Sequence, residues 1–443
     1  MSNYAPAPAD RVFRINPALD FTDDTAYVAV KIPVVTGDEL RDQVAVITSR
    51  RQLFPWGEDS RFGAGIIAAA GCPRLLEPRW GRESIQEFQS GAAAPDTAGI
   101  HQSVRAYLQQ YLGFRHPAEY DLVALWIMGT YLKPLFKCYP ILFFNAPYES
   151  GKSRCLEVIS QLAFNGKWFG EITPAAFRRY SAETRPTFCL DELQEVGLKN
   201  NSTMIAILLN AYNSAEMMLT GPVGRAGWAP VLLKVTSAVA FSNIQPIKNQ
   251  ALQSRTISIR TEYDPRFKGN RLPDVFAPEP SQVRNELYRW LLGHWQVVRE
   301  QYLAYPALDS LSAREMDTYQ PLLAMADLAG PDVARAVAGY AGAVKEQKRM
   351  VQKATDDHLD LLLFIQGELA ARGLGEEFPE ISNRELADAY YRQTKMRLNY
   401  RRFLEMVSAL QVTAEIRNRS GSKYFTFNRA EIARQLRIGE AKS

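Results

Sequence analysis

Cysteine is scarce in this chain of 443 residues, with four residues and no Cys-x-x-Cys pair. A zinc site built on such pairs and a disulfide framework are therefore not expected, and a reducing, cytoplasmic compartment is. No apolar run reaches about 18 residues, so no membrane helix is expected, and the N-terminus lacks the apolar segment of a signal peptide. The formal net charge of +4 permits a nucleic-acid partner without requiring one.

Apolar residues are present in the proportion of an ordinary globular protein, at 47% of the chain. The β-branched runs at 27–32 and 43–47 predict a β-rich N-terminal domain over residues 1–95. Apolar residues then recur at helical spacing, which predicts a helical linker or collar over residues 96–134. Strand and helix signals alternate over residues 135–280, the pattern of an α/β core.

A phosphate-binding loop is the strongest motif of this core. The apolar run 139–144 predicts a buried parallel strand, and the loop after it matches G-x-x-x-x-G-K-[ST] except for Ala146 in place of the first glycine. Lys152 is expected to begin a helix and to reach the β- and γ-phosphates of ATP, and Ser153 to bind Mg²⁺. The candidate nucleotide-binding residues are Ala146, Pro147, Tyr148, Glu149, Ser150, Gly151, Lys152, Ser153 and Arg154.

Two acidic residues follow the next apolar strand, at Asp191 and Glu192. Asp191 is expected to hold Mg²⁺ directly or through water, and Glu192 to polarise the water that attacks the γ-phosphate. The alternative interpretation is a solvated helix start after a core strand.

Polar residues also stand at the boundaries of two later strands. Asn243 closes the apolar run 235–241 and is expected to orient the water and sense the γ-phosphate, although it could be an ordinary turn residue. Arg255 opens a β-branched strand, and in ring-shaped NTPases such an arginine stabilises charge in the site of the neighbouring subunit. Arg260 is the second candidate for this role, and a surface arginine is the alternative interpretation.

A hairpin is predicted around Arg225, where glycines and a proline separate two strand-like runs. In ring helicases a hairpin at this place in the chain projects into the central pore. There Arg225 would bind the phosphates of a single strand and Trp228 would stack on its bases. The alternative is an ordinary hairpin with a tryptophan that belongs to the core.

The C-terminal third is predicted to be helical over residues 281–355 and to form a winged-helix-like domain over residues 356–443. This domain is expected to begin with a helix capped at Asp356–Asp357. Helices from about 382 and 400 and a basic hairpin with its turn at Ser420–Ser422 are expected to follow.

These motifs resemble those of superfamily 3 and AAA+-like P-loop helicases of phages, plasmids and integrated elements. The resemblance is carried by residues 146–153, 186–192, 209–212 and 252–255. Residues 313–330 are similar to a segment of primase-associated helicase-like proteins in which an arginine, an aspartate and an aromatic residue precede "PLLAIAD". The similarity covers roughly residues 135–423 and leaves the N-terminal domain outside.

The resemblance implies a hexameric, ATP-driven DNA helicase or translocase in the replication of a mobile genetic element, with single-stranded DNA in its pore. It assigns Asn243 as sensor, Arg255 as arginine finger and Arg314 as a second sensor in the helical lid. The chain shows no primase motif, so a separate primase would supply priming. Two other interpretations stay open: a DNA-binding ATPase that acts as initiator or loader without separating strands, and a non-enzymatic nucleic-acid-binding scaffold.

Overall fold

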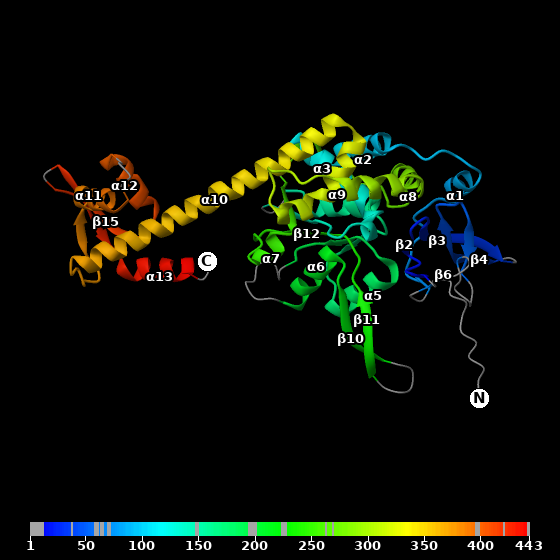
Figure 1. Ribbon diagram of the computed structural model, residues 1–443, viewed down its shortest axis with the longest axis horizontal. Helices are drawn as coiled ribbons and strands as arrows, with labels where there is room; N and C mark the ends of the chain where they lie inside the picture. The colour runs from blue at the N-terminus through cyan, green and yellow to red at the C-terminus, as the bar shows by residue number, and fades with distance from the viewer. Residues whose placement is uncertain are drawn as a thin grey trace. The chain divides into compact units, whose positions relative to one another are not determined.

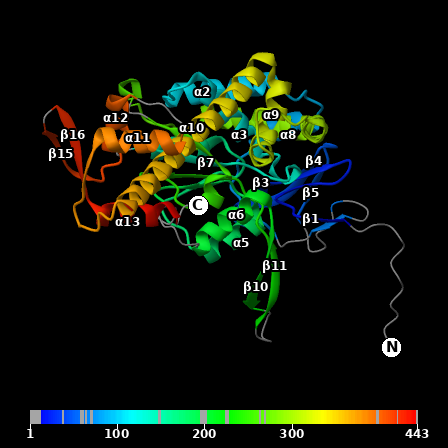
Figure 2. The same ribbon diagram turned by 60° about the vertical axis from the view of Figure 1, so that its left-hand side comes forward.

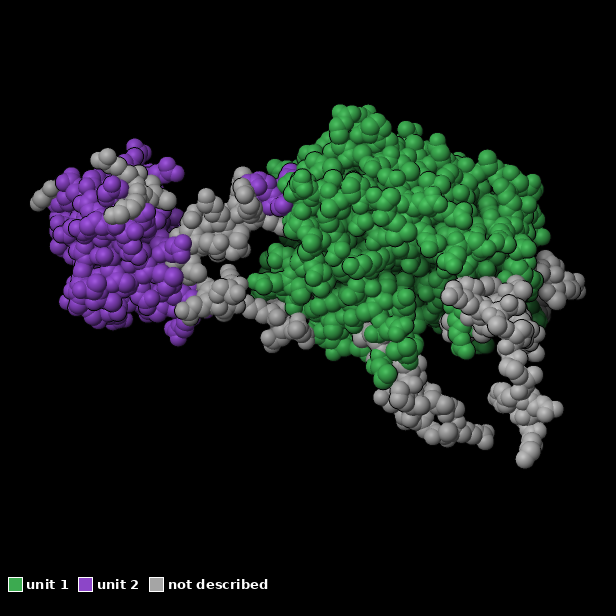
Figure 3. All heavy atoms as spheres, viewed as in Figure 1, with its two compact units in different colours: residues 1–342 green, residues 343–443 purple. Residues whose placement is uncertain are grey.

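The computed structural model describes residues 13–36, 39–56, 62, 66–68, 72–146, 150–193, 202–222, 228–261, 264–267, 270–394, 399–419 and 421–440. The chain divides into two compact units, residues 1–342 and residues 343–443, which we call unit 1 and unit 2 (Figure 3). The finer division into five segments stays a prediction.

Unit 1 begins with the predicted β-rich region. Four strands form an antiparallel sheet in chain order, and two further short strands pair in parallel. The strands are β1 (Phe13–Ile15), β2 (Leu19–Phe21), β3 (Ala26–Thr36), β4 (Glu39–Thr48), β5 (Leu53–Pro55) and β6 (Ile66–Ala68), and α1 (Arg82–Gln89) follows. The β-branched runs expected to form strands lie within β3 and β4.

The centre of unit 1 is a parallel sheet of five strands in the order β13-β7-β12-β9-β8. The strands are β7 (Ile141–Asn145), β8 (Lys167–Phe169), β9 (Phe188–Leu190), β12 (Val239–Asn243) and β13 (Thr256–Arg260). Successive residues of β7 face opposite sides, so Leu142 and Phe144 join one core cluster while Ile141 and Phe143 join another. The sheet is therefore covered on both faces, which explains its almost continuous apolar strands.

Helices form the two outer layers of this α/β arrangement (Figure 1). One core cluster includes residues of α2 (Thr97–Tyr111), α3 (Pro117–Thr130), α4 (Lys152–Leu162), α8 (Pro278–Ala304) and α9 (Ala313–Ala329). The other includes residues of α5 (Pro174–Thr184), α6 (Thr203–Asn213) and α7 (Gln250–Gln253). Two short 3₁₀ turns, η1 (Lys133–Leu135) and η3 (Pro265–Phe267), lie between elements of this region.

Two buried arginines hold the C-terminal end of α4. Arg79 Nη1 donates to the carbonyls of Ser160 and Gln161 at 2.9 and 3.3 Å, and Arg284 Nη1 donates to Gln161 O at 2.8 Å. The last carbonyls of a helix have no partner within the helix and lie at the negative end of its dipole, so guanidinium groups stabilise them. These contacts fix the C-terminal end of α4. The N-terminal end of the same helix is at Lys152.

A third buried cation, Lys133 of η1, has a different environment, with only 2% of its surface exposed. Its Nζ donates to Ser214 Oγ at 2.6 Å and lies 5.9 Å from the centre of the Tyr139 ring. Burial lowers the pKa of Lys133 to about 7, because removal from water disfavours the charged ammonium. The positive charges of Arg185 and Lys234 also lower the pKa of Lys133. The protonated form of Lys133 is therefore unfavourable in the folded chain.

Lys133→Met is expected to stabilise the protein at pH 7 by on the order of 3 kcal/mol. The unfolded chain keeps the Lys133 proton up to about pH 10, whereas the folded chain releases it above about pH 7. The free energy of unfolding of the wild type should therefore rise between these pH values, and methionine should remove that rise. Urea denaturation at pH 7 and 9.5 measures both effects, with the exposed Lys137→Met as the matched control. An equal gain at both pH values would contradict the prediction.

Unit 2 and the end of unit 1 share one long helix, α10 (Pro331–Ala371). The helix start expected at Asp356–Asp357 is wrong, because α10 runs through these residues without a break. The chain has no proline between Pro331 and this point, and its lysines, glutamates and glutamines favour helix. A cap signal therefore does not start a helix where one already continues.

The rest of unit 2 is a small three-stranded antiparallel sheet of order β14-β16-β15 with helices packed on it. Its elements are β14 (Glu380–Ser382), α11 (Asn383–Thr394), α12 (Tyr400–Ala409), β15 (Thr413–Arg419), β16 (Ser422–Phe427) and α13 (Arg429–Glu440). The predicted hairpin is present, and Gly421 in its turn has φ of 76°, a conformation that glycine adopts without strain. In the described part of the chain, no helix has the length and apolarity to cross a membrane.

Candidate functional site

The start of α4 lies at the carboxyl end of β7, where the sequence predicts the phosphate-binding loop. Ala146 follows β7 directly, and α4 begins at Lys152, as expected. Gly151 precedes the helix with φ of 83°, so this position requires a residue without Cβ strain. The remaining loop candidates, Pro147, Tyr148 and Glu149, lie outside the described residues.

The Lys152 ammonium lies across this loop and is largely buried, at 7% exposure. Its Nζ donates to Ala146 O at 2.8 Å and lies 3.5 Å from Ser150 Oγ. Burial lowers the pKa of Lys152, while the negative charges of Glu192 and Asp191 oppose that shift. Both acidic candidates are thus close enough to act on Lys152 electrostatically.

Asp191 and Glu192 follow β9 at the same edge of the sheet. Ser242 Oγ of β12 donates to Asp191 Oδ1 at 2.6 Å and accepts a hydrogen bond from the Glu192 backbone N–H at 3.2 Å. Glu192 is exposed and has φ of 48°, a left-handed conformation that costs energy for a residue with a side chain. One serine therefore fixes both the carboxylate of Asp191 and the backbone of Glu192.

Asn243 ends β12, between the strands that carry the loop and the acidic pair. Its Nδ2 donates to Leu193 O at 2.6 Å, and its Oδ1 accepts from the Gln245 N–H at 3.0 Å. Asn145, its register partner on β7, donates to the carbonyls of Asn243 and Ile244, both at 3.0 Å. These bonds fix the orientation of the Asn243 amide, and Nδ2 carries a second N–H that a γ-phosphate oxygen can accept.

The strand order explains why these residues meet. All strands of the sheet run parallel, and β12 lies between β7 and β9. The carboxyl ends of these strands therefore share one edge, where ligands bind in open α/β sheets. The fold brings Lys152, Asp191 and Asn243 to this edge, although Lys152 and Asn243 are 91 positions apart in the sequence.

Arg255 and Arg260 lie at opposite ends of β13, and so at the two opposite edges of the sheet where its parallel strands begin and end. Thr256 pairs with Ile141 at the start of β7, and Arg260 pairs with Asn145 at its end. Arg255 precedes Thr256, and its carbonyl accepts from the Ile141 N–H at 3.1 Å. Five strand residues separate the two edges by about 16 Å. Arg260 thus lies at the edge of the phosphate-binding loop, and Arg255 lies at the other edge.

The donor set at the loop edge fits a magnesium ion bound together with a nucleotide. Ser153 is exposed in the first turn of α4, and Asp191 supplies a carboxylate. Hydroxyl, carboxylate, phosphate and water oxygens suit Mg²⁺, which seldom relies on an all-protein cage. Among the described residues, no group of three or more His, Cys, Asp and Glu side chains could bind a metal by itself.

The Arg154 side chain is bound by carbonyls that lie outside the phosphate-binding loop. Its Nε donates to Tyr111 O at 2.8 Å and its Nη1 to Asn270 O at 2.7 Å. The guanidinium therefore ties α4 to α2 and to the segment before α8. Only the Arg154 backbone N–H, in the first turn of α4, remains a candidate for phosphate binding.

Ser242 and Thr261, which the sequence reasoning did not assign, also shape the site, together with Asn145 at the start of the loop segment. Ser242 contacts the acidic pair, Asn145 contacts the end of β12, and Thr261 Oγ1 donates to Ser150 Oγ at 3.3 Å. Each lies at or just beyond the carboxyl end of a central strand. A polar residue at that place was the available signal, but the strand order needed to use it is not written in the sequence.

The predicted hairpin is formed by β10 (Glu216–Pro222) and β11 (Trp228–Lys234), which pair along their whole length. In two views it extends away from α5 and α6 (Figures 1 and 2). Met218 and Leu232 are direct cross-strand partners and are 73% and 57% exposed. Arg225 lies outside the described residues, and of Trp228 the structure describes the backbone at the start of β11.

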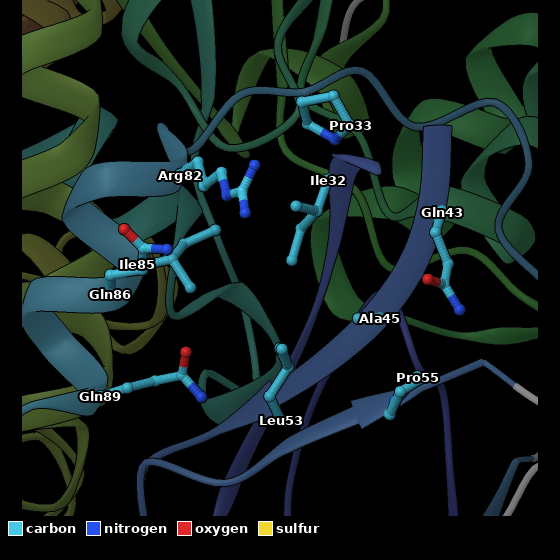
Figure 4. A pocket seen from close by; sticks show the side chains of 10 residues that line it. All are labelled: Ile32, Pro33, Gln43, Ala45, Leu53, Pro55, Arg82, Ile85, Gln86 and Gln89. Carbon is cyan, nitrogen blue, oxygen red and sulfur yellow. The ribbon is translucent and has the colours of Figure 1, made fainter. Parts of the chain in front are cut away.

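A separate pocket of about 400 Å³ lies between the N-terminal sheet and α1 (Figure 4). Its lining includes Ile32, Leu53 and Ile85 together with Arg82 and three glutamines. It shares no residue with the Lys152 site.

No protein-family model matches the chain, and no curated protein matches it. Among solved structures, the chain is similar to "SCCmec type IV Cch - active helicase" at 10% identity and TM-score 0.36, over 83% of this chain and 74% of that one. It is also similar to a full-length MCM homolog from Methanopyrus kandleri at 12% identity and TM-score 0.38, over 72% and 76%. The NrS-1 C-terminal region aligns at 12% identity and TM-score 0.30, over 87% and 94%.

Proposed function

We propose that this chain is an ATP-hydrolysing P-loop protein that forms a ring and moves along DNA as a helicase or translocase. The observation that carries the proposal is the meeting of Lys152, Asp191–Glu192 and Asn243 at one edge of a parallel sheet. The sequence resemblance supplies the finer part: a hexamer that works in the replication of a mobile genetic element, with a separate primase.

In this proposal the residues divide the chemistry of phosphoryl transfer. Lys152 and the N–H groups at the start of α4 bind the phosphates. A bound Mg²⁺ would neutralise charge on the phosphates, with Ser153 and Asp191 as its protein ligands. Glu192, exposed next to the Asp191 carboxylate, orients and deprotonates the attacking water. Ser242 keeps Asp191 and Glu192 in place through the two hydrogen bonds it shares with them.

Charge distribution favours a nucleic acid as the partner. Residues 343–443 contain 18 of the 52 Lys and Arg residues and 14 of the 48 Asp and Glu residues, so unit 2 carries the whole net charge of +4. Within unit 2 the excess lies after residue 382, where 13 basic residues face 6 acidic ones. The order of elements from the end of α10 to β16 supports a winged helix there, whose exposed Arg401 and Arg402 would contact phosphates.

Lys152→Ala is expected to lower the ATPase kcat by about 10²–10³-fold, because it removes a preorganised charge from the phosphates. Steady-state ATP hydrolysis with and without single-stranded DNA measures the effect. Lys137→Ala is the matched control, since Lys137 is an exposed lysine before the other end of β7. Full activity in the Lys152 variant would exclude the proposed site.

Strand displacement on a forked duplex separates the proposal from its nearest alternative. A helicase unwinds the fork only while it hydrolyses ATP. DNA-stimulated hydrolysis without displacement would instead favour an initiator, loader or simple translocase. DNA binding with no hydrolysis would favour the non-enzymatic scaffold.

A further inference from the structure

The Arg255 side chain is held by the ring of one tyrosine. Its guanidinium carbon lies 5.5 Å from the centre of the Tyr212 ring, and its Nη1 donates to Ala251 O at 2.7 Å. Arg255 is half-buried, and its Nε is a buried atom without a hydrogen-bond partner among the described residues. Among the described residues, the arginine is therefore oriented by an aromatic face and one carbonyl, and no carboxylate pairs with it.

Tyr212 is itself fixed at both of its ends. It is 1% exposed in the last turn of α6, and its carbonyl accepts from the Tyr139 N–H at 2.8 Å. Its hydroxyl lies 3.1 Å from Thr318 Oγ1 of α9, and Thr318 donates its own proton to Arg314 O at 3.0 Å. The Tyr212 and Thr318 hydroxyls thus share one hydrogen bond. Burial raises the pKa of the Tyr212 hydroxyl, so this hydroxyl stays protonated at neutral pH.

The same helix leads directly into the hairpin. Ser214 ends α6 in a left-handed conformation and is held by Lys133, and β10 begins two residues later. The Val235 N–H donates to Ala215 O at 3.4 Å and so closes the base of the hairpin. A shift of the Tyr212 ring would thus move the last turn of α6, to which the hairpin is attached.

We propose that Tyr212 is a positioning residue for Arg255 and couples it to the β10–β11 hairpin. The proposal rests on the proposed function, in which Arg255 enters the nucleotide site of a neighbouring subunit. The ring face restricts the guanidinium without pairing its charge, so the cation stays available for phosphate. The hydroxyl bond to Thr318 keeps the ring from rotating away.

A purely structural role of Tyr212 predicts a different result. If Tyr212 only fills the core, its loss weakens folding and acts on catalysis without regard to Arg255. If Tyr212 acts through Arg255, the two residues form one functional unit. Substitution of Tyr212 should then have no effect on kcat once Arg255 has been replaced. Phenylalanine keeps the ring and removes only the hydroxyl, so it separates the aromatic contact from the bond to Thr318.

The experiment is a double-mutant cycle on kcat for ATP hydrolysis by the full chain. Tyr212→Leu is expected to lower kcat by about 3–30-fold, the range that a cation–aromatic contact supports, with KM for ATP changed by less than about 2-fold. Tyr212→Phe should retain most of the activity. In an Arg255→Ala background, Tyr212→Leu should cause no further loss. An equal loss in both backgrounds overturns the positioning role.

Stimulation of hydrolysis by single-stranded DNA tests the coupling to the hairpin. The ratio of kcat with and without DNA should fall in Tyr212→Leu, and an unchanged ratio overturns the coupling. If the leucine variant does not fold, Tyr212→Met removes the aromatic face while keeping a long apolar side chain in the core, and the same cycle applies. Failure of the proposed function would look different, since wild-type hydrolysis would then be absent or insensitive to Lys152→Ala.

Discussion

Arg255→Ala is expected to lower kcat for ATP hydrolysis by about 10³-fold or more while leaving ATP binding nearly unchanged. An arginine finger stabilises the charge that develops on the transferred phosphoryl group, so its loss falls on the transition state. Arg255 lies at the sheet edge opposite Lys152, so in the proposed ring it would act on the nucleotide of a neighbouring subunit and not on that of its own chain. The measurements are single-turnover hydrolysis and the affinity for an ATP analogue.

Mixing two inactive variants tests the trans arrangement. A subunit with Arg255→Ala keeps its own phosphate site, and a subunit with Lys152→Ala keeps its finger. In a mixed ring the second can complete the site of the first, so activity should reappear. Arg260→Ala is the matched control because Arg260 lies on the same strand at the edge of the phosphate-binding loop. No recovery on mixing, or a larger loss in Arg260→Ala, would remove the assignment of Arg255.

Glu192→Gln is expected to lower kcat by about 10²–10⁴-fold, the usual contribution of a general base. Glutamine has nearly the same shape and keeps the hydrogen bond from its backbone N–H to Ser242, but it cannot accept a proton. ATP should therefore still bind, and the unhydrolysed complex should accumulate. Rapid-quench hydrolysis and filter binding of labelled ATP give the two quantities.

A neighbouring glutamate provides the control for this variant. Glu157 is exposed in the middle of α4, away from the start of the helix, and Glu157→Gln should leave kcat within about 2-fold because surface changes of this kind have small effects. If Glu192→Gln also hydrolyses ATP at the wild-type rate, the water must be activated by another group. Asp191→Asn, which should raise the magnesium requirement, then identifies whether the acidic pair acts at all.

Much of the fold could be predicted because its signals are local. The start of α4 after Gly151 depends on one loop and one helix, and the hairpins at 216–234 and 413–427 depend on neighbouring strands. The helix start at Asp356 failed for the opposite reason. A capping aspartate is a local signal, and the continuity of α10 over 41 residues outweighed it.

The site itself required long-range information. The sequence by itself determined the candidate residues: a lysine at a helix start, two carboxylates after one strand, an amide after another and an arginine before a third. The tertiary structure decided their neighbours, because strand order is set by the packing of helices on both faces of the sheet. That order brings Ser242 to Asp191 and Tyr212 to Arg255. It also separates Arg255 from the Lys152 site of the same chain.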